Sequence, residues 1–91
     1  MIENSFRIKN KALIDKVVKS GESGMGYHIV TVTTKDVKRY DNVLVMNSDE
    51  IAGIYGYDKF PFCEDDIADI DVTHLKKPKD FNQQNWLYLK R

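Results

Sequence analysis

Tyr27-His-Ile-Val-Thr-Val-Thr-Thr34 is the stretch that decides the fold. It is rich in β-branched residues, which pack well on a pleated sheet and lose side-chain freedom in a helix. Residues 39–47 carry a second run of this kind, and the polar Lys35-Asp-Val-Lys38 between the two runs is typical of a hairpin turn. The sequence therefore predicts two antiparallel strands, 27–34 and 39–47, in a β-rich domain.

Shorter elements are predicted after this hairpin. Residues 51–55 predict a third strand, and Phe60–Phe62 predicts a short fourth one, because Pro61 donates no backbone hydrogen bond. Residues 64–66 suit a single helical turn, and residues 67–73 predict the last strand of the sheet. In that strand Ile70 and Val72 share the inward face, and the outward face carries Ile67, Asp69 and Asp71.

A helix is expected before the strands, within residues 8–20. Asn10 suits its N-cap, and apolar residues recur at helical spacing between Ala12 and Val18. Gly21 follows as a natural end, because glycine adopts the left-handed backbone conformation without a clash. The glycines of residues 21–26 do not predict a phosphate-binding loop, since such a loop precedes a helix N-terminus and this one follows a helix.

The second predicted strand is apolar on both faces. Val43 and Val45 share one face, and Leu44 and Met46 share the other. A strand that is apolar on both faces is normally buried on both. Something must therefore cover the second face, and the candidates are the N-terminal helix and a second copy of the protein.

The C-terminal residues 76–91 form a basic and aromatic extension of a single domain that spans residues 1–91. Within it, Trp86-Leu-Tyr-Leu89 is too apolar for a free tail. We expect this segment to add an edge strand to the sheet or to pack back on the domain.

The densest charge cluster of the chain is acidic. It consists of Glu64, Asp65, Asp66, Asp69 and Asp71. As a metal site it lacks the alternating ligands and the glycine of a calcium loop. It is instead a solvated face that discourages edge-to-edge aggregation, or a surface complementary to a basic partner.

Basic and acidic residues, fourteen of each, cancel to zero net charge but are segregated along the chain. Residues 1–20 and 76–91 each carry five basic side chains, whereas residues 41–75 carry nine acidic ones and one basic one. If the basic ends meet in space, they could hold single-stranded RNA or DNA between exposed aromatic rings. Those rings are Tyr27, Tyr40, Tyr55, Tyr57, Trp86 and Tyr88. The competing interpretation is that the lysines solvate a helix and a tail while the aromatic rings fill a small core.

No spacing in the sequence indicates catalysis, a cofactor or a metal. His28 and His74 approach each other if the first and last strands pair, with Cys63 nearby, but there is no Cys-x-x-Cys or His-x-His. Structural histidines and a buried free cysteine are favoured. Cys63 is the single cysteine, and residues 1–19 contain no apolar run, so we expect a cytoplasmic protein that is not bound to a membrane.

The order of elements resembles that of small SH3-like or Sm-like β-barrels. The resemblance lies in a helix, closely spaced strands, Phe60-Pro-Phe62, a short acidic turn and Asp66-Ile-Ala-Asp-Ile-Asp-Val72, and it covers residues 8–74. It implies an α+β, mainly β fold with a small antiparallel barrel of four or five strands. A helix on an open or strongly bent sheet is the alternative. The Sm signatures are absent, including a glycine in the turn 35–38 and an Arg-Gly pair in the later strands, so no binding residue is carried over.

Taken together, these features predict a small non-enzymatic protein-binding module without a cofactor. An adaptor, an immunity-type protein and an inhibitor from a mobile element all fit. The expected partner is another protein, a second copy of the chain (a homodimer) included. The expected surface combines the acidic cluster with Leu44, Met46 and Trp86. The alternative is a small barrel that binds RNA or single-stranded DNA through the basic ends.

Overall fold

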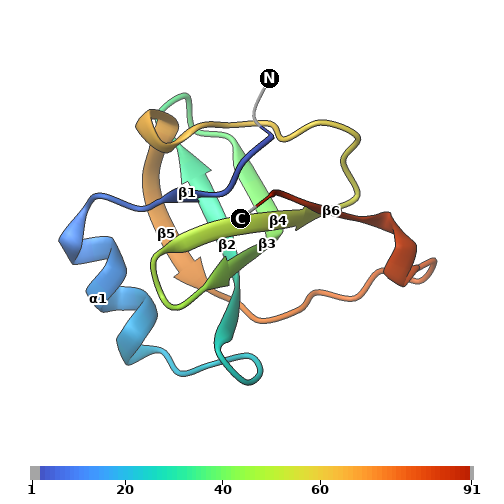
Figure 1. The fold of residues 1–91 in the computed structure, drawn as a ribbon, viewed down its shortest axis with the longest axis horizontal. Helices are drawn as coiled ribbons and strands as arrows, with labels where there is room; N and C mark the ends of the chain where they lie inside the picture. The colour runs from blue at the N-terminus through green and yellow to red at the C-terminus, as the bar shows by residue number, and fades with distance from the viewer. Residues whose placement is uncertain (1–2, 91) are drawn as a thin grey trace.

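The computed structural model describes residues 3–90 of the chain (Figure 1). In chain order its elements are β1 (Phe6–Arg7), α1 (Lys11–Lys19), β2 (Tyr27–Thr34), β3 (Arg39–Met46), β4 (Glu50–Tyr55), the 3-10 turn η1 (Glu64–Asp66), β5 (Ile67–Val72), the 3-10 turn η2 (Gln83–Asn85) and β6 (Trp86–Tyr88). The predicted α+β, mainly β class is confirmed.

All the strands belong to one antiparallel sheet that curls into a half-barrel. The strand order is β1-β4-β3-β2-β5, and β6 pairs with β4 beside β1. The hairpin of β2 and β3 runs from the pair Thr33 and Arg39 to the pair Tyr27 and Met46. The predicted resemblance to small barrels therefore holds at the level of a small curled β-sheet with one helix. The sheet has six strands, against the four or five expected.

Helix α1 begins at Lys11, three residues later than the earliest bound that we expected. Asn10 is its N-cap, because the side-chain oxygen accepts a hydrogen bond of 3.0 Å from the backbone N–H of Ala12. Ile8 precedes this cap and is buried in the core. At the other end Ser20 is the C-cap, and Gly21 follows with a φ of 79°. The capping residues therefore set the length of the helix.

The core fills the concave side of the sheet. It contains Ile8, Leu13, Val17, Val30, Val32, Val43, Val45, Ile51, Ile54, Phe60, Phe62, Ile70 and Leu89. Helix α1 contributes Leu13 and Val17 and packs beside β5, as Figure 1 shows. The ammonium group of Lys16 lies 3.1 Å from Asp69 and 2.7 Å from Asp71 of that strand. The helix thus protects the edge strand β5, which would otherwise invite pairing with another chain.

Phe60–Phe62 is not a strand, so this prediction is wrong. Phe60 and Phe62 are both buried, and their rings meet Phe6 of β1 edge to face at 5.7 and 6.3 Å. Phe60 and Phe62 therefore fill the core, although the segment that carries them does not pair with any strand of the described sheet. β1 itself has only two residues, and the sequence pattern did not predict it.

Ile67 also differs from its prediction, because it packs against the core. Thr33 pairs with Asp69 and Thr34 pairs with Ile67, so one residue of β5, Ala68, is extra. Such a bulge reverses the alternation of faces beyond it. Ile67 therefore shares the inner side with Ile70, while Asp69 and Asp71 keep the outer side.

The C-terminal residues return to the sheet. Leu87 pairs with Ile54 of β4, and Leu89 is 6% exposed in the core. The predicted edge strand near Trp86 is therefore confirmed.

None of the helices within residues 3–90 is long and apolar enough to cross a membrane.

Candidate binding groove on the outer face of the sheet

A groove lies on the outer face of the sheet, opposite the core. Leu44 of β3 pairs with Ile29 of β2 and with Gly53 of β4, and Gly53 pairs in turn with Tyr88 of β6. These four residues form one row across the strands. Because Gly53 has no side chain, it places no atoms in the space above the sheet between Leu44 and Tyr88. The register of four strands therefore produces a hollow in the outer face.

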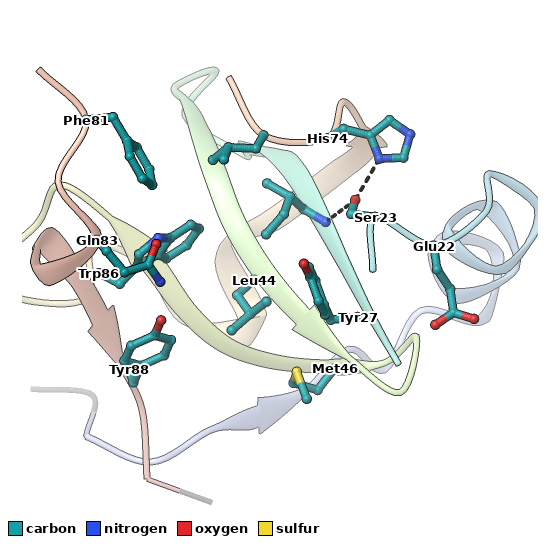
Figure 2. Close-up of a pocket in the computed structure, with 12 residues that line it drawn as sticks. Glu22, Ser23, Tyr27, Leu44, Met46, His74, Phe81, Gln83, Trp86 and Tyr88 are labelled. Atoms are coloured by element: carbon teal, nitrogen blue, oxygen red, sulfur yellow. Dashed lines mark hydrogen bonds between the residues drawn. The ribbon is translucent and has the colours of Figure 1, made fainter. Parts of the chain in front are cut away.

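Aromatic side chains stand on both sides of Leu44 (Figure 2). Tyr27 of β2 is on one side, and Trp86 and Tyr88 of β6 are on the other, with Met46 near Leu44 in the floor. The rings of Trp86 and Tyr88 are stacked, with centroids 6.2 Å apart. The groove has a volume of about 610 Å³, which lies within the range of about 300–1,000 Å³ typical of ligand sites.

Residues 73–85, which we call the C-terminal strap, border the far end of the groove. Asn42 of β3 anchors the strap by two hydrogen bonds, donating to the Lys76 carbonyl oxygen at 2.9 Å and accepting from its N–H at 2.8 Å. Phe81 stacks on Tyr55 with ring centroids 5.0 Å apart, and the Tyr55 hydroxyl accepts a hydrogen bond from the Asn82 N–H. These contacts hold the strap against β3 and β4 and fix Phe81 at the rim.

The β2 side of the groove is polar. The Ser23 hydroxyl lies 2.6 Å from Nδ1 of His74 and accepts a hydrogen bond from the backbone N–H of Ile29. Within residues 3–90, no carboxylate is hydrogen-bonded to the His74 ring. The arrangement therefore lacks the third group that orients the histidine of a catalytic triad. It ties the loop 21–26 to the C-terminal strap.

The predicted apolar site residues come together in this groove. Leu44, Met46 and Trp86 all line it. Of the two candidates for covering the face of Leu44 and Met46, the N-terminal helix does not cover it. The buried residues of α1, Leu13 and Val17, belong to the core on the opposite face. The C-terminal strap and β6 flank the second face instead, and they leave Leu44 and Met46 half-buried.

The predicted acidic residues lie elsewhere and are divided among different contacts. Asp69 and Asp71 bind Lys16, and a carboxylate oxygen of Glu64 accepts a weak hydrogen bond of 3.3 Å from the Lys9 N–H. Asp65 is exposed beside them. Asp66 accepts hydrogen bonds from the N–H and the thiol of Cys63, and these bonds lower the pKa of the Asp66 carboxyl below its ordinary value. None of the five acidic residues lines the groove.

The two histidines and Cys63 do not form one site. His28 is buried, with Nδ1 2.9 Å from the Gly21 carbonyl oxygen and Nε2 3.3 Å from the Ser48 hydroxyl. Cys63 is half-buried beside Asp66, whereas a buried free cysteine was expected. Within the described residues no group of three potential metal ligands comes together.

The basic ends do meet, but many of their charges are already paired. The N–H of Ser5 donates to the Lys90 carbonyl oxygen at 2.7 Å, which places the two ends of the described chain side by side. Arg7 pairs with Asp49 at 2.8 Å, and Lys76 pairs with Asp41 at 3.3 Å. Lys9 and Lys16 also have acidic partners.

Several groove residues were not predicted as one site. Ser23 and Phe81 come from loops, and only tertiary contacts bring them to this face. A signal existed for Gly53, since a glycine inside a strand often marks a close approach of another backbone. A Cβ atom on Gly53 would lie 2.8 Å from the carbonyl oxygen of Leu87.

Comparison with family models, with curated proteins and with solved structures finds no match to this chain.

Proposed function

We propose that the protein is a non-enzymatic protein-binding module and that its groove takes up an apolar segment of the partner. One observation carries this proposal. Leu44 and Met46 remain half-buried between aromatic walls, although the core on the opposite face is complete. Apolar hollows of this kind on a protein surface mark interaction sites.

The aromatic walls suit such a role. Trp and Tyr are the residues that most often dominate binding energy at protein interfaces, because they bury large areas and lose little side-chain freedom. Trp86 and Tyr88 stand side by side at the wall, and Tyr88 is 58% exposed. An adaptor, an immunity-type protein and an inhibitor from a mobile element would all use such a surface.

The acidic residues support the proposal less than the groove does. A partner that bound Asp69 and Asp71 would have to displace Lys16, which both carboxylates already contact. Exposed ion pairs of this kind contribute little energy, about 1 kcal/mol or less. The groove, in contrast, offers apolar surface that has no partner within the described fold.

Selection of displayed peptides tests the proposal directly. A random peptide library is selected on the wild-type protein, and binding is measured through the fluorescence of Trp86, which is the sole tryptophan of the chain. We expect selected peptides to shift this fluorescence and to lose most of their affinity for Leu44→Lys. Val18→Lys is the matched control, because Val18 is an exposed apolar residue of α1 that does not line the groove.

Circular dichroism must first show that both variants are folded. If selected peptides bind the two variants equally well, the groove is not the binding surface and the proposal fails. Failure to select any peptide that shifts Trp86 contradicts it as well.

A further inference from the structure

We propose that the partner segment is an amphipathic helix whose basic residue lies at the Glu22 end of the groove. This inference rests on the proposed function and names the chemistry of the partner. It follows from the shape of the groove, from the state of the backbone in its floor, and from its charge.

The groove is wide enough for a helix. Its walls stand on β2 and β6, and the strands β3 and β4 lie between them. Neighbouring strands are about 4.8 Å apart, and three such spacings separate β2 from β6. The backbones that carry the two walls are therefore roughly 14 Å apart. A helix with its side chains is about 10–12 Å across. A second copy of the chain would present the same hollow, and two hollows facing each other leave their floors apart.

The floor offers no backbone partners to an extended peptide. β3 is paired with β2 and β4, and β4 is paired on its other edge with β1 and β6, so their backbone groups serve the sheet. A strand laid on this face would bury N–H and C=O groups without hydrogen bonds, which is costly. A helix satisfies its backbone internally and presents only side chains to the groove.

The side chains of the groove match an apolar stripe. Ile29, Leu44 and Met46 form an apolar floor, and Leu75 at the rim is 40% exposed. A helix whose apolar residues recur at positions i, i+3, i+4 and i+7 places them on one face, which would fill this hollow. Met46 adds adaptability, because the methionine side chain fills irregular gaps.

Glu22 sets the charge of the partner. It is the charged carboxylate among the lining residues, and its side chain accepts a hydrogen bond from the Gly26 N–H. Within residues 3–90 Glu22 forms no ion pair. The loop that carries Glu22 is open to solvent, since its Met25 is 99% exposed. At the other end the Lys77 ammonium lies 5.0 Å from the centre of the Phe81 ring. A basic residue is therefore favoured near Glu22 and disfavoured near Phe81.

Synthetic peptides test this inference. The probes are helical peptides of about 18 residues, or five turns, with a leucine stripe and lysines near one end, made in both orientations. A shuffled peptide of the same composition and a proline-interrupted peptide with the same leucines are the controls. We expect one helical peptide to bind at least about tenfold tighter than both controls, as measured by Trp86 fluorescence, and to gain helicity on binding.

Glu22→Lys tests the charge. It should weaken binding of the lysine peptide about two- to fivefold, and a peptide with glutamates in place of the lysines should recover the loss. The location of the bound helix in the groove is tested separately with Leu44→Lys, which should abolish binding of every helical peptide.

Three outcomes would overturn the inference. If proline-interrupted or shuffled peptides bind as tightly as the helices and still depend on Leu44, the groove remains a binding site and the helical partner is wrong. If the protein is dimeric by sedimentation and Leu44→Lys makes it monomeric, a second copy occupies the groove. If no helical peptide binds although displayed peptides select the groove, the partner has another structure.

Discussion

Gly53 is the residue on which the groove depends most directly. Its backbone lies against β6, where a Cβ atom would come within 2.8 Å of the Leu87 carbonyl oxygen and 3.4 Å of Tyr88 Cδ1. The first of these contacts is to backbone, which cannot move aside without shifting the strand. β6 can approach β4 this closely because Gly53 has only a hydrogen atom in place of a side chain.

Gly53→Ala should push β6 away from β4. We expect a loss of about 1–3 kcal/mol in the free energy of unfolding, since an added carbon in a packed site forces the backbone to shift. Urea unfolding measures the loss of stability, and the fluorescence emission of Trp86 reports the displacement of β6. Gly21→Ala is the control, because it meets no atom within 4 Å but has a φ of 79°. It should cost stability through the backbone alone and leave Trp86 unchanged. Equal spectra for wild type and Gly53→Ala would contradict the role of Gly53.

Thr31 is a buried polar residue of β2 on the outer face of the sheet. Its hydroxyl donates a hydrogen bond of 2.7 Å to the Asp41 carboxylate and lies 3.0 Å from the Thr73 hydroxyl. The bond from Thr31 is the main reason why the pKa of the Asp41 carboxyl lies below its ordinary value, with a smaller contribution from Lys76. A carboxyl whose pKa is lowered by folding stabilises the protein above its unfolded pKa and loses that contribution as the pH falls through the folded pKa.

Thr31→Val should remove this contribution. We expect a loss of about 1 kcal/mol in unfolding free energy at neutral pH, the usual magnitude for one hydrogen bond. The difference from wild type should shrink at a pH below the folded pKa of Asp41, and the pKa of Asp41 should rise toward its ordinary value in an NMR titration. Thr33→Val is the matched control, since no side-chain hydrogen bond joins Thr33 to the described residues. A constant difference across the acid range would show that Asp41 is not involved.

At the scale of elements, α1 depends on its cap and on its contacts with the sheet. It has nine residues, which is too short for a stable isolated helix, because helices below about 12–15 residues are marginal in water. Asn10 closes its first turn, and Leu13 and Val17 bind it to the core. Its lysine at position 16 is fixed by two aspartates of β5, and their hydrogen bonds raise the pKa of the Lys16 ammonium.

Asn10→Ala should fray the first turn of α1. The expected loss is about 1 kcal/mol in unfolding free energy, together with a weaker helical signal in circular dichroism. Asn10→Asp is the control, because a carboxylate accepts the same hydrogen bond from the Ala12 N–H and should keep the stability of the wild type. Equal stability of the alanine and aspartate variants would rule out a capping contribution.

The elements that were predictable are those with local signals. α1 has a cap and a helical period, and the hairpin of β2 and β3 has β-branched runs about a polar turn, so both follow from neighbouring residues. β1 has two residues and exists only because β4 offers an edge. Phe60 and Phe62 alternate like strand residues, yet they have no strand to pair with and instead fill the space beside Phe6.

The candidate site was predictable only in part for the same reason. Leu44 and Met46 follow from the alternation of one strand, and Trp86 from an apolar tail. The acidic residues were predicted to share a surface with these apolar residues. The sequence shows where acidic residues are dense, but it does not show which basic residues of the same chain pair with them. Lys16 is separated from Asp69 by 53 residues along the chain and reaches it only in the folded protein.

At the scale of the whole molecule, the pairing of charges bears on the choice between the two proposed kinds of partner. The net charge is zero, and acidic residues of the sheet and its turns hold Arg7, Lys9, Lys16 and Lys76. Binding of nucleic acid requires basic groups that are available to phosphates. These ion pairs therefore compete with any nucleic acid for the same cations.

The protein should not be retained by mixed-sequence single-stranded DNA at about 50 mM salt. A variant with asparagine in place of Asp41, Asp49, Asp69 and Asp71 frees Arg7, Lys16 and Lys76 from their acidic partners. We expect this variant to be retained and to elute as salt rises. Column retention at several salt concentrations measures both proteins. Salt-sensitive retention of the wild type would favour the nucleic-acid hypothesis over the proposed protein partner.

The parallel contact between Asn4 and Lys90 has a consequence for how the chain can be reconnected. A linker of a few residues from Lys90 to Asn4 would connect these two positions without disturbing β1 or β6. New ends could then be opened in the exposed turn around Val37, which is 81% exposed and connects β2 to β3. Such a circular permutant would keep every strand pair of the sheet, because the fold is specified by contacts between strands and not by the point at which the polypeptide starts.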